Sequence, residues 1–242
     1  MFLGDPTFLL LIPTFILALY AQAKVKGAYA KYGRIASASR LTGAQAAYQL
    51  LQTAGAGDVA IEKVAGDLTD HYDPRKKVLR LSQGVHDSPS IAALGIAAHE
   101  TAHAIQHHQH YQPMHLRSLI YPVASIGSTL AFPLFFIGFI TGSGSRPLMD
   151  LGILLFTGAV AFSVVTLPVE FNASRRALAL LEERSFLTPD EMVGARKVLG
   201  AAALTYVAST AMAARLLASV SSRPQYLPSR YVLRVTGLES TA

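Results

Sequence analysis

Two uncharged runs, residues 118–141 and 151–169, limit the folds open to this chain. They are 24 and 19 residues long, and a helix of about 20 apolar residues is needed to cross the hydrocarbon part of a bilayer. Only the segment GSGSRPLMD separates them, and a cluster of glycine, serine and proline is typical of a loop. The pattern therefore predicts a transmembrane hairpin.

Two further apolar runs lie before and after the hairpin. Residues 6–23 carry no charge and end against Lys24 and Lys26, which predicts a single membrane helix. A cleaved signal peptide is the alternative, but the preceding residues MFLGD lack a basic segment. The alanine-rich run 198–214 is shorter. We expect residues 198–222 to form a fourth membrane helix, with a packed core helix as the alternative.

The composition agrees with a membrane protein. Hydrophobic residues make up 51% of the chain and charged residues 15%, so the chain is more apolar than an ordinary soluble domain. The formal net charge is +6, but the basic residues do not gather on one face as a nucleic-acid partner would require. There is no cysteine, which excludes disulfides and thiolates and leaves His, Asp and Glu as candidate ligands for a transition metal.

The distribution of lysine and arginine predicts the orientation in the membrane. None lies in residues 1–23, eleven lie in 24–117, one lies in 142–150 and five lie in 170–197. Because loops rich in these residues stay on the cytoplasmic side, 24–117 and 170–197 are both expected there. Two segments that are far apart in sequence would thus share one compartment.

The polar segment 24–117 predicts a small mixed domain. Thr42 and Gln45 form a capping-box pattern before a helix that Gly55 would end. The stretches DVAIEKVA and VLRLS lie on either side of the turn DPRKK. Their composition predicts two neighbouring strands of a small sheet.

The next predicted helix carries the clearest chemical signal. Ser88 and Pro89 predict an N-cap and a first helical residue, followed by a helix through IAALGIAAHETAHAIQH. This helix is apolar on nearly all sides before His99 and should be buried. Histidines four positions apart share a helix face, so His99 and His103 can bind one ion. Glu100 lies about 100° round the helix, where it can reach a metal-bound water without binding the metal.

These three residues match the zinc-peptidase signature H-E-x-x-H, and a catalytic zinc also needs a third protein ligand and an open position. The metzincin pattern requires a glycine and a histidine where this chain has Gln106 and Gln109, so that class is excluded. His107, His108 and His110 are minor candidates, because a helix rises about 6 Å between positions four apart. We expect them mostly to be polar surface residues.

Glu170 is the stronger candidate for the third ligand. It is the first charged residue after the run 151–169 and lies on the same predicted side of the membrane as His99 and His103. A carboxylate that merely stabilises the start of a helix is the alternative.

Three segments, AAHETAHAIQH, LTDHYDPRKKVLRLS and TLPVEFNASRRAL, together resemble the YugP-like family of neutral zinc metallopeptidases, which are bacterial integral-membrane proteins. The resemblance covers nearly the whole chain. More distantly, EFNASRRA is similar to the third-ligand helix of HtpX-like and CAAX-processing membrane proteases, whose glutamate completes the zinc site. This implies Glu170 as a ligand. Those families have an aspartate where this chain has Ser174, so a hydroxyl or another acceptor would have to orient a zinc-bound histidine.

The resemblance also implies a fold and a substrate site. The fold would be mainly α with a small β-sheet, in which membrane helices carry a gluzincin-like core. The strands flanking DHYDP would offer an edge for an extended peptide, with His71 and Tyr72 as candidate oxyanion donors. An Asp-Pro turn with local hydrogen bonds is the alternative. Arg175 and Arg176 would bind the substrate carboxyl end or anionic headgroups.

The sequence thus predicts a membrane-embedded zinc endopeptidase at the bacterial cell membrane, with its site on the cytoplasmic side. One catalytic Zn²⁺ would be bound by His99, His103 and Glu170, and Glu100 would act as general base. The expected partners are the lipid bilayer and a peptide or protein substrate, and no nucleic acid. The predicted segments are 6–23, 24–117 as the peptidase domain, 118–169, 170–197 with the third ligand, 198–222, and a loosely ordered tail at 223–242.

Two other classes of function are open to the same residues. A non-catalytic membrane scaffold, with a structural metal or none, would favour a closed four-ligand site that His107 or His71 completes. A metal transporter would place ionisable residues inside the membrane runs. The runs 118–141 and 151–169 carry no charge, which counts against transport.

Overall fold

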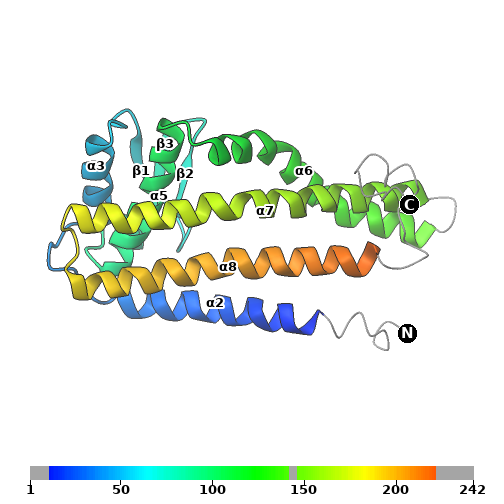
Figure 1. The fold of residues 1–242 in the computed structure, drawn as a ribbon, viewed down its shortest axis with the longest axis horizontal. Helices are drawn as coiled ribbons and strands as arrows, with labels where there is room; N and C mark the ends of the chain where they lie inside the picture. Colours follow the sequence, from blue (N-terminus) through cyan, green and yellow to red (C-terminus); the bar gives the residue numbers. More distant parts are fainter. Residues whose placement is uncertain (1–10, 142–145, 222–242) are drawn as a thin grey trace, which may run out of the picture. The chain divides into compact units, whose positions relative to one another are not determined.

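The computed structural model describes residues 11–141 and 146–221, which are mainly helical with one small sheet (Figure 1). This confirms the predicted mixture of helices and strands. The tail 223–242 and the start of the run 6–23 lie outside the described residues. The helices are α2 (Ile12–Tyr32), α3 (Gly43–Thr53), α4 (Gln83–His86), α5 (Ile91–His108), α6 (Gln112–Thr141), α7 (Arg146–Glu183) and α8 (Pro189–Ser221), and the strands are β1 (Ala60–Val64), β2 (His71–Asp73) and β3 (Val78–Ser82).

The sheet has the order β1-β3-β2. β1 pairs with β3 in parallel, with Ile61 opposite Leu79, so the two predicted strands are neighbours as expected. The sequence did not indicate β2, which pairs antiparallel with β3 and places Tyr72 opposite Leu79. At three residues, β2 is too short to show an alternating pattern.

The predicted helix starts are right for α3 and wrong for α5. Thr42 and Gln45 form both hydrogen bonds of a capping box. The N-cap of α5 is Ser90, whose Oγ accepts from the backbone of Ala93, and not Ser88. A β-bridge between Ala36 and Ser90 keeps residues before α5 extended, and this contact with a distant segment could not be read from the local sequence.

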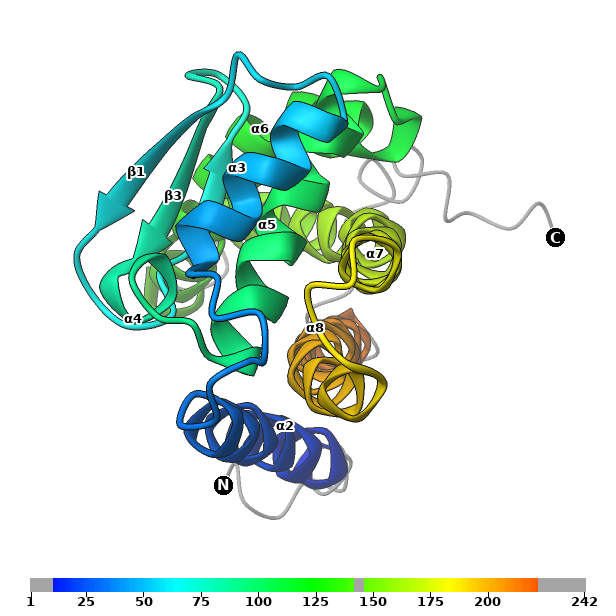
Figure 2. The same ribbon diagram turned by 90° about the vertical axis from the view of Figure 1, so that its left-hand side faces the viewer.

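The described chain forms two compact units, and the site lies in the unit made of residues 19–116 and 166–207. In this unit the sheet and α3 lie on one side of α5, and the segments of α7 and α8 that belong to the unit lie on the other (Figure 2). Ala93, Ala97 and Ala104 of α5 belong to the core cluster that contains Leu79 and Leu81 of β3. The buried helix predicted from its apolar sequence is therefore confirmed.

Small side chains line the opposite face of α5. Ala98 and Ala102 share a core cluster with Ala173 and Ala177 of α7. The separation of packed helices depends on the side chains between them, and alanines allow a close approach. The segment of α7 that begins near Glu170 can therefore pack closely against the H-E-x-x-H helix.

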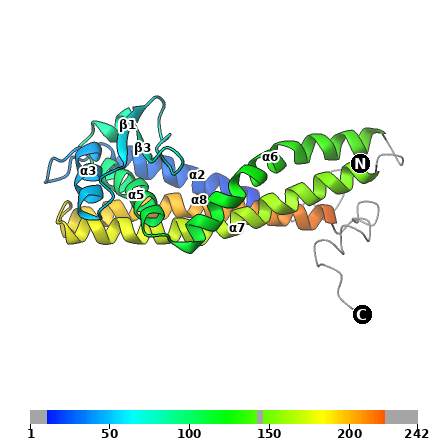
Figure 3. The same cartoon turned by 90° about the horizontal axis from the view of Figure 1, so that it is seen from above.

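The other unit contains residues 117–165 of the hairpin and the end of α8. α6 and α7 run antiparallel there, since Tyr121 contacts Phe162 and Phe132 contacts Phe156 (Figure 3). Large apolar side chains on α6 are exposed, as a bilayer would require: Leu119, Val123, Ile126 and Ile140.

Three described helices are long and apolar enough to cross a membrane. They are α6, α7 and α8, which contain the predicted second, third and fourth apolar runs. α7 continues without a break from the run 151–169 into the segment that carries Glu170. Within the described residues, α2 does not meet the same criterion.

Candidate metal centre

Helix α5 presents two buried histidines one turn apart. His99 is 8% exposed and His103 is 5% exposed. Their rings meet edge to face, with centroids 4.8 Å apart. The four-residue spacing places both imidazoles on one face, as predicted.

Glu170 reaches the same point from α7. Its side chain is buried, and its Oε2 lies 3.2 Å from His99 Nε2 and 3.4 Å from His103 Nε2. The candidate ligand atoms of these three residues all lie within 4.8 Å of one another. The structure therefore brings together the two histidines and the glutamate that the sequence singled out.

The distances from Glu170 to the two histidines fit a zinc ion. Zinc binds histidine nitrogen and carboxylate oxygen at about 2.0–2.2 Å in a tetrahedral arrangement, which separates neighbouring ligand atoms by roughly 3.3–3.6 Å. The distances from Oε2 to the two Nε2 atoms, 3.2 and 3.4 Å, are close to this separation. Two imidazoles and one carboxylate are also the ligand set of a catalytic zinc with an open position.

Each histidine is held at its other ring nitrogen. His99 Nδ1 lies 3.2 Å from Ser174 Oγ, and His103 Nδ1 lies 3.0 Å from Gln106 Oε1. Such contacts orient metal-binding imidazoles in proteins. The hydroxyl of Ser174 is thus the group that contacts His99, in agreement with the expected orienting hydroxyl.

In the sequence, Gln106 is distinctive only because it breaks the metzincin pattern. It lies three positions after His103, which places the two side chains on one helix face. That spacing is the only signal that could have indicated the contact.

Glu100 follows His99 on α5 and is partly buried. It is not one of the three residues that could hold the metal. Its role as general base stays a prediction from the sequence.

The candidate oxyanion donors have contacts of their own. His71 is exposed, and its Nδ1 lies 2.8 Å from the carbonyl oxygen of Thr69. Tyr72 is buried, and its hydroxyl hydrogen-bonds to Nδ1 of His107 at 2.9 Å. Burial and the nearby carboxylates of Asp58 and Asp73 raise the pKa of Tyr72 to about 12, so the hydroxyl keeps its proton at neutral pH.

The remaining histidines of α5 lie outside the group. His108 and His110 are exposed, and His107 is partly buried against Tyr72. Within residues 11–141 and 146–221, the only group of three or more candidate ligands is His99, His103 and Glu170. A closed site completed by His107 or His71 is therefore not the arrangement that the structure describes.

The two arginines after Glu170 differ in their exposure and contacts. Arg175 is exposed. Arg176 donates from Nε to Asn172 Oδ1 at 2.8 Å, and its guanidinium carbon lies 5.8 Å from the ring centre of Tyr111. Arg176 is thus part of the packing around α5.

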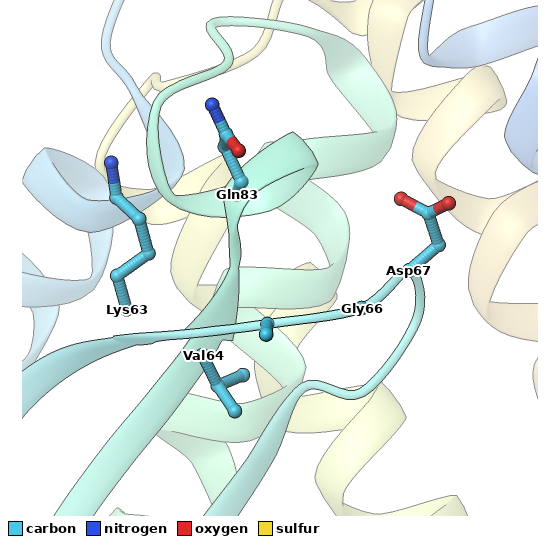
Figure 4. Close-up of a pocket in the computed structure, with 6 residues that line it drawn as sticks. Lys63, Val64, Gly66, Asp67 and Gln83 are labelled. Carbon is cyan, nitrogen blue, oxygen red and sulfur yellow. The ribbon is translucent and has the colours of Figure 1, made fainter.

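A surface hollow of about 570 Å³ lies at the end of β1 (Figure 4). Lys63, Val64, Gly66, Asp67 and Gln83 line it together with Ala65. None of the candidate metal ligands belongs to this lining.

Comparison with known proteins gives two consistent matches. A family model described as "Putative neutral zinc metallopeptidase" matches residues 7–222. The chain is also 47% identical over 193 residues to "Putative membrane protease YugP" of Bacillus subtilis (strain 168), which covers 80% of this chain and 85% of that protein. No solved structure matches the chain significantly.

Proposed function

The chain belongs to the family of neutral zinc metallopeptidases, and on this premise we propose that it is a membrane-embedded endopeptidase with one catalytic zinc. The proposal rests mainly on one observation. Nε2 of His99 and Nε2 of His103 converge on one carboxylate oxygen of Glu170 in a buried site. The family, the residue types and the distances support the proposal of a gluzincin-like site.

The three residues would hold the ion and leave one position open. A bound zinc would supply Lewis acidity, which makes a water more acidic and polarises the carbonyl of the scissile peptide. Glu100 is the proposed general base. Its carboxylate takes a proton from the attacking water and then delivers that proton to the nitrogen of the leaving amine.

The sheet offers a place for the substrate. Within the described chain, β2 pairs with β3 alone, so its other edge has no strand partner and is the candidate position for an extended peptide. β2 also packs against α5 through Tyr72 and His107. We propose that the peptide lies along β2, with His71, Tyr72 and Arg175 as candidate contacts.

The same proposal includes a location. The three membrane-length helices and the "membrane protease" name of the relative support an integral-membrane protein. We propose several membrane crossings, with the metal centre on the cytoplasmic side because the basic segments 24–117 and 170–197 build it.

The test compares three forms of the full-length protein in lipid nanodiscs: wild type, Glu100→Gln and the control Glu183→Gln, which changes an exposed carboxylate of α7. The probe is unfolded casein, with zinc content measured on the same samples. We expect similar zinc content in all three and casein cleavage that falls about 10²–10⁴-fold in Glu100→Gln alone. Wild-type cleavage rates in Glu100→Gln would reject the mechanism, and zinc-loaded wild type that cleaves nothing would favour the scaffold.

A further inference from the structure

We infer that Gln106 is a positioning residue that sets the tautomer of His103, and that Asn172 and Arg176 hold its amide in the required orientation. This inference rests on the proposed zinc site. It assigns a role to side chains that neither bind the ion nor touch the substrate.

The donors and acceptors of this hydrogen-bond network can be assigned in order, starting at Arg176. A guanidinium only donates, so the atom 2.8 Å from Arg176 Nε must be an acceptor, the Oδ1 of Asn172. That oxygen also lies 2.9 Å from Nε2 of Gln106. The orientation of the Asn172 amide therefore follows from the arginine.

The amide of Gln106 is oriented in turn. Its nitrogen donates to Asn172 Oδ1 and, at 3.0 Å, to the carbonyl oxygen of Val169. Both partners are acceptors, so the opposite orientation would place oxygen against two oxygens. The amide oxygen of Gln106 must then face His103.

This oxygen determines which nitrogen of His103 carries the proton. Gln106 Oε1 lies 3.0 Å from His103 Nδ1 and can only accept, so Nδ1 must carry hydrogen. In the neutral ring Nε2 then presents a lone pair, and it does so 3.4 Å from Glu170 Oε2. A lone pair and a carboxylate oxygen that face each other in a buried site repel, and a divalent cation bound between them removes that repulsion.

His99 lacks this control. Its Nδ1 contacts the hydroxyl of Ser174, which can donate or accept and therefore allows either tautomer. Gln106 is fully buried, and both hydrogens of its amide are used. The bond to Val169 also ties α5 to the residue that precedes Glu170.

The two glutamines that break the metzincin pattern both belong to this network. Gln109 Oε1 accepts from Nη1 of Arg176, the residue at which the assignment starts. A metzincin needs a glycine and a histidine at these two positions. Here one glutamine contacts His103 and the other contacts Arg176.

The experiment uses the full-length protein in nanodiscs with ¹⁵N-labelled histidine. Gln106→Met keeps the length of the side chain and removes the hydrogen bonds. Asn172→Leu and Asn172→Asp form a matched pair, because the aspartate keeps both acceptor contacts and the leucine keeps neither. The readouts are zinc affinity as a function of pH and the tautomer of His103 in zinc-free protein at alkaline pH.

We expect zinc affinity to fall about 10–100-fold in Gln106→Met and Asn172→Leu, and to stay near the wild-type value in Asn172→Asp. The wild-type ring of His103 should carry its proton on Nδ1, and Gln106→Met should show a mixture of tautomers. Wild-type affinity and an unchanged tautomer in Gln106→Met would overturn the inference. If that variant fails to fold, equal affinities in Asn172→Leu and Asn172→Asp would overturn it instead.

The outcome is separable from that of the proposed function, because neither readout needs turnover. Zinc-loaded wild type that cleaves no peptide would refute the endopeptidase and leave the role of Gln106 intact.

Discussion

The histidines of the H-E-x-x-H motif and the histidines that follow it differ in their surroundings. His99 and His103 are buried and meet the carboxylate of Glu170. One turn later, His107 contacts Tyr72, and the exposed His110 stacks on His115 with ring planes 15° apart. A high local density of histidine therefore does not define the metal centre.

The difference comes from what packs against each set of histidines. Alanines of α7 allow that helix to approach α5 closely and bring an acidic side chain to the first pair. The second set contacts an aromatic hydroxyl and other histidines, and the charge of Asp58 only partly offsets the positive charges around His107. We propose that a buried carboxylate, and not the number of imidazoles, makes the first pair a site for a divalent cation.

The largest expected effect comes from removing that carboxylate. Glu170→Ala should lower zinc affinity by more than the roughly 100-fold typical of losing an outer-shell partner, because it deletes a proposed ligand. His107→Ala is the matched change in the second set of histidines and should keep wild-type zinc content. Zinc titration of both variants measures the contrast, and similar losses in the two would remove the distinction between the two sets.

A smaller effect is expected from changing the packing that delivers Glu170. Ala173 is fully buried in the cluster between α5 and α7. Ala173→Leu should lower the free energy of unfolding by about 1–3 kcal/mol through overpacking and should also weaken zinc binding. Ala179→Leu, at an exposed position of the same helix, is the control. Thermal unfolding in detergent with and without zinc tests this, and an unaffected Ala173→Leu variant would show that close packing is not required.

The sequence predicts the features that depend on local contacts, and it does not predict those that depend on contacts between distant segments. The spacing of His99 and His103 is a property of one helix, and the capping box at Thr42 is similarly local, so both were predictable. The position of Glu170 after the run 151–169 makes it the stronger candidate for the third ligand, and the resemblance to known families adds the expectation that it binds the ion. Gln106 and Ser174 could not be assigned, because their roles depend on which helix packs beside α5.

The errors have the same origin. Ser-Pro is a frequent helix start and predicts an N-cap at Ser88, but residues up to Ser90 are extended by the bridge to Ala36 and α5 begins at Ile91. β2 was missed because its three residues gain their strand conformation from pairing with β3. Both depend on segments that the local pattern does not contain.

The smallest predicted effect is on the stability of the folded protein at acidic pH. Burial, followed by the charges of His115, Lys77 and His110, lowers the pKa of His107 below its ordinary value of 6.5. The unfolded chain then binds the proton more readily, so this residue reduces stability as the pH falls from about 6.5 through the lowered pKa, and has no effect at higher pH. His107→Gln should therefore be slightly less sensitive to acid than wild type. Unfolding of zinc-free protein as a function of pH measures this, and equal or greater acid sensitivity would contradict it.

The central claim is that two imidazoles and one carboxylate bind a single zinc with an open position. X-ray absorption at the zinc edge of the full-length protein tests it most directly, on wild type and on a variant that lacks His107, His110 and His115. The account predicts two histidine nitrogens and oxygen ligands at about 2.0–2.2 Å, with the same spectrum in the variant. A site with three or more imidazoles, or a spectrum that changes when the second set of histidines is removed, would contradict it.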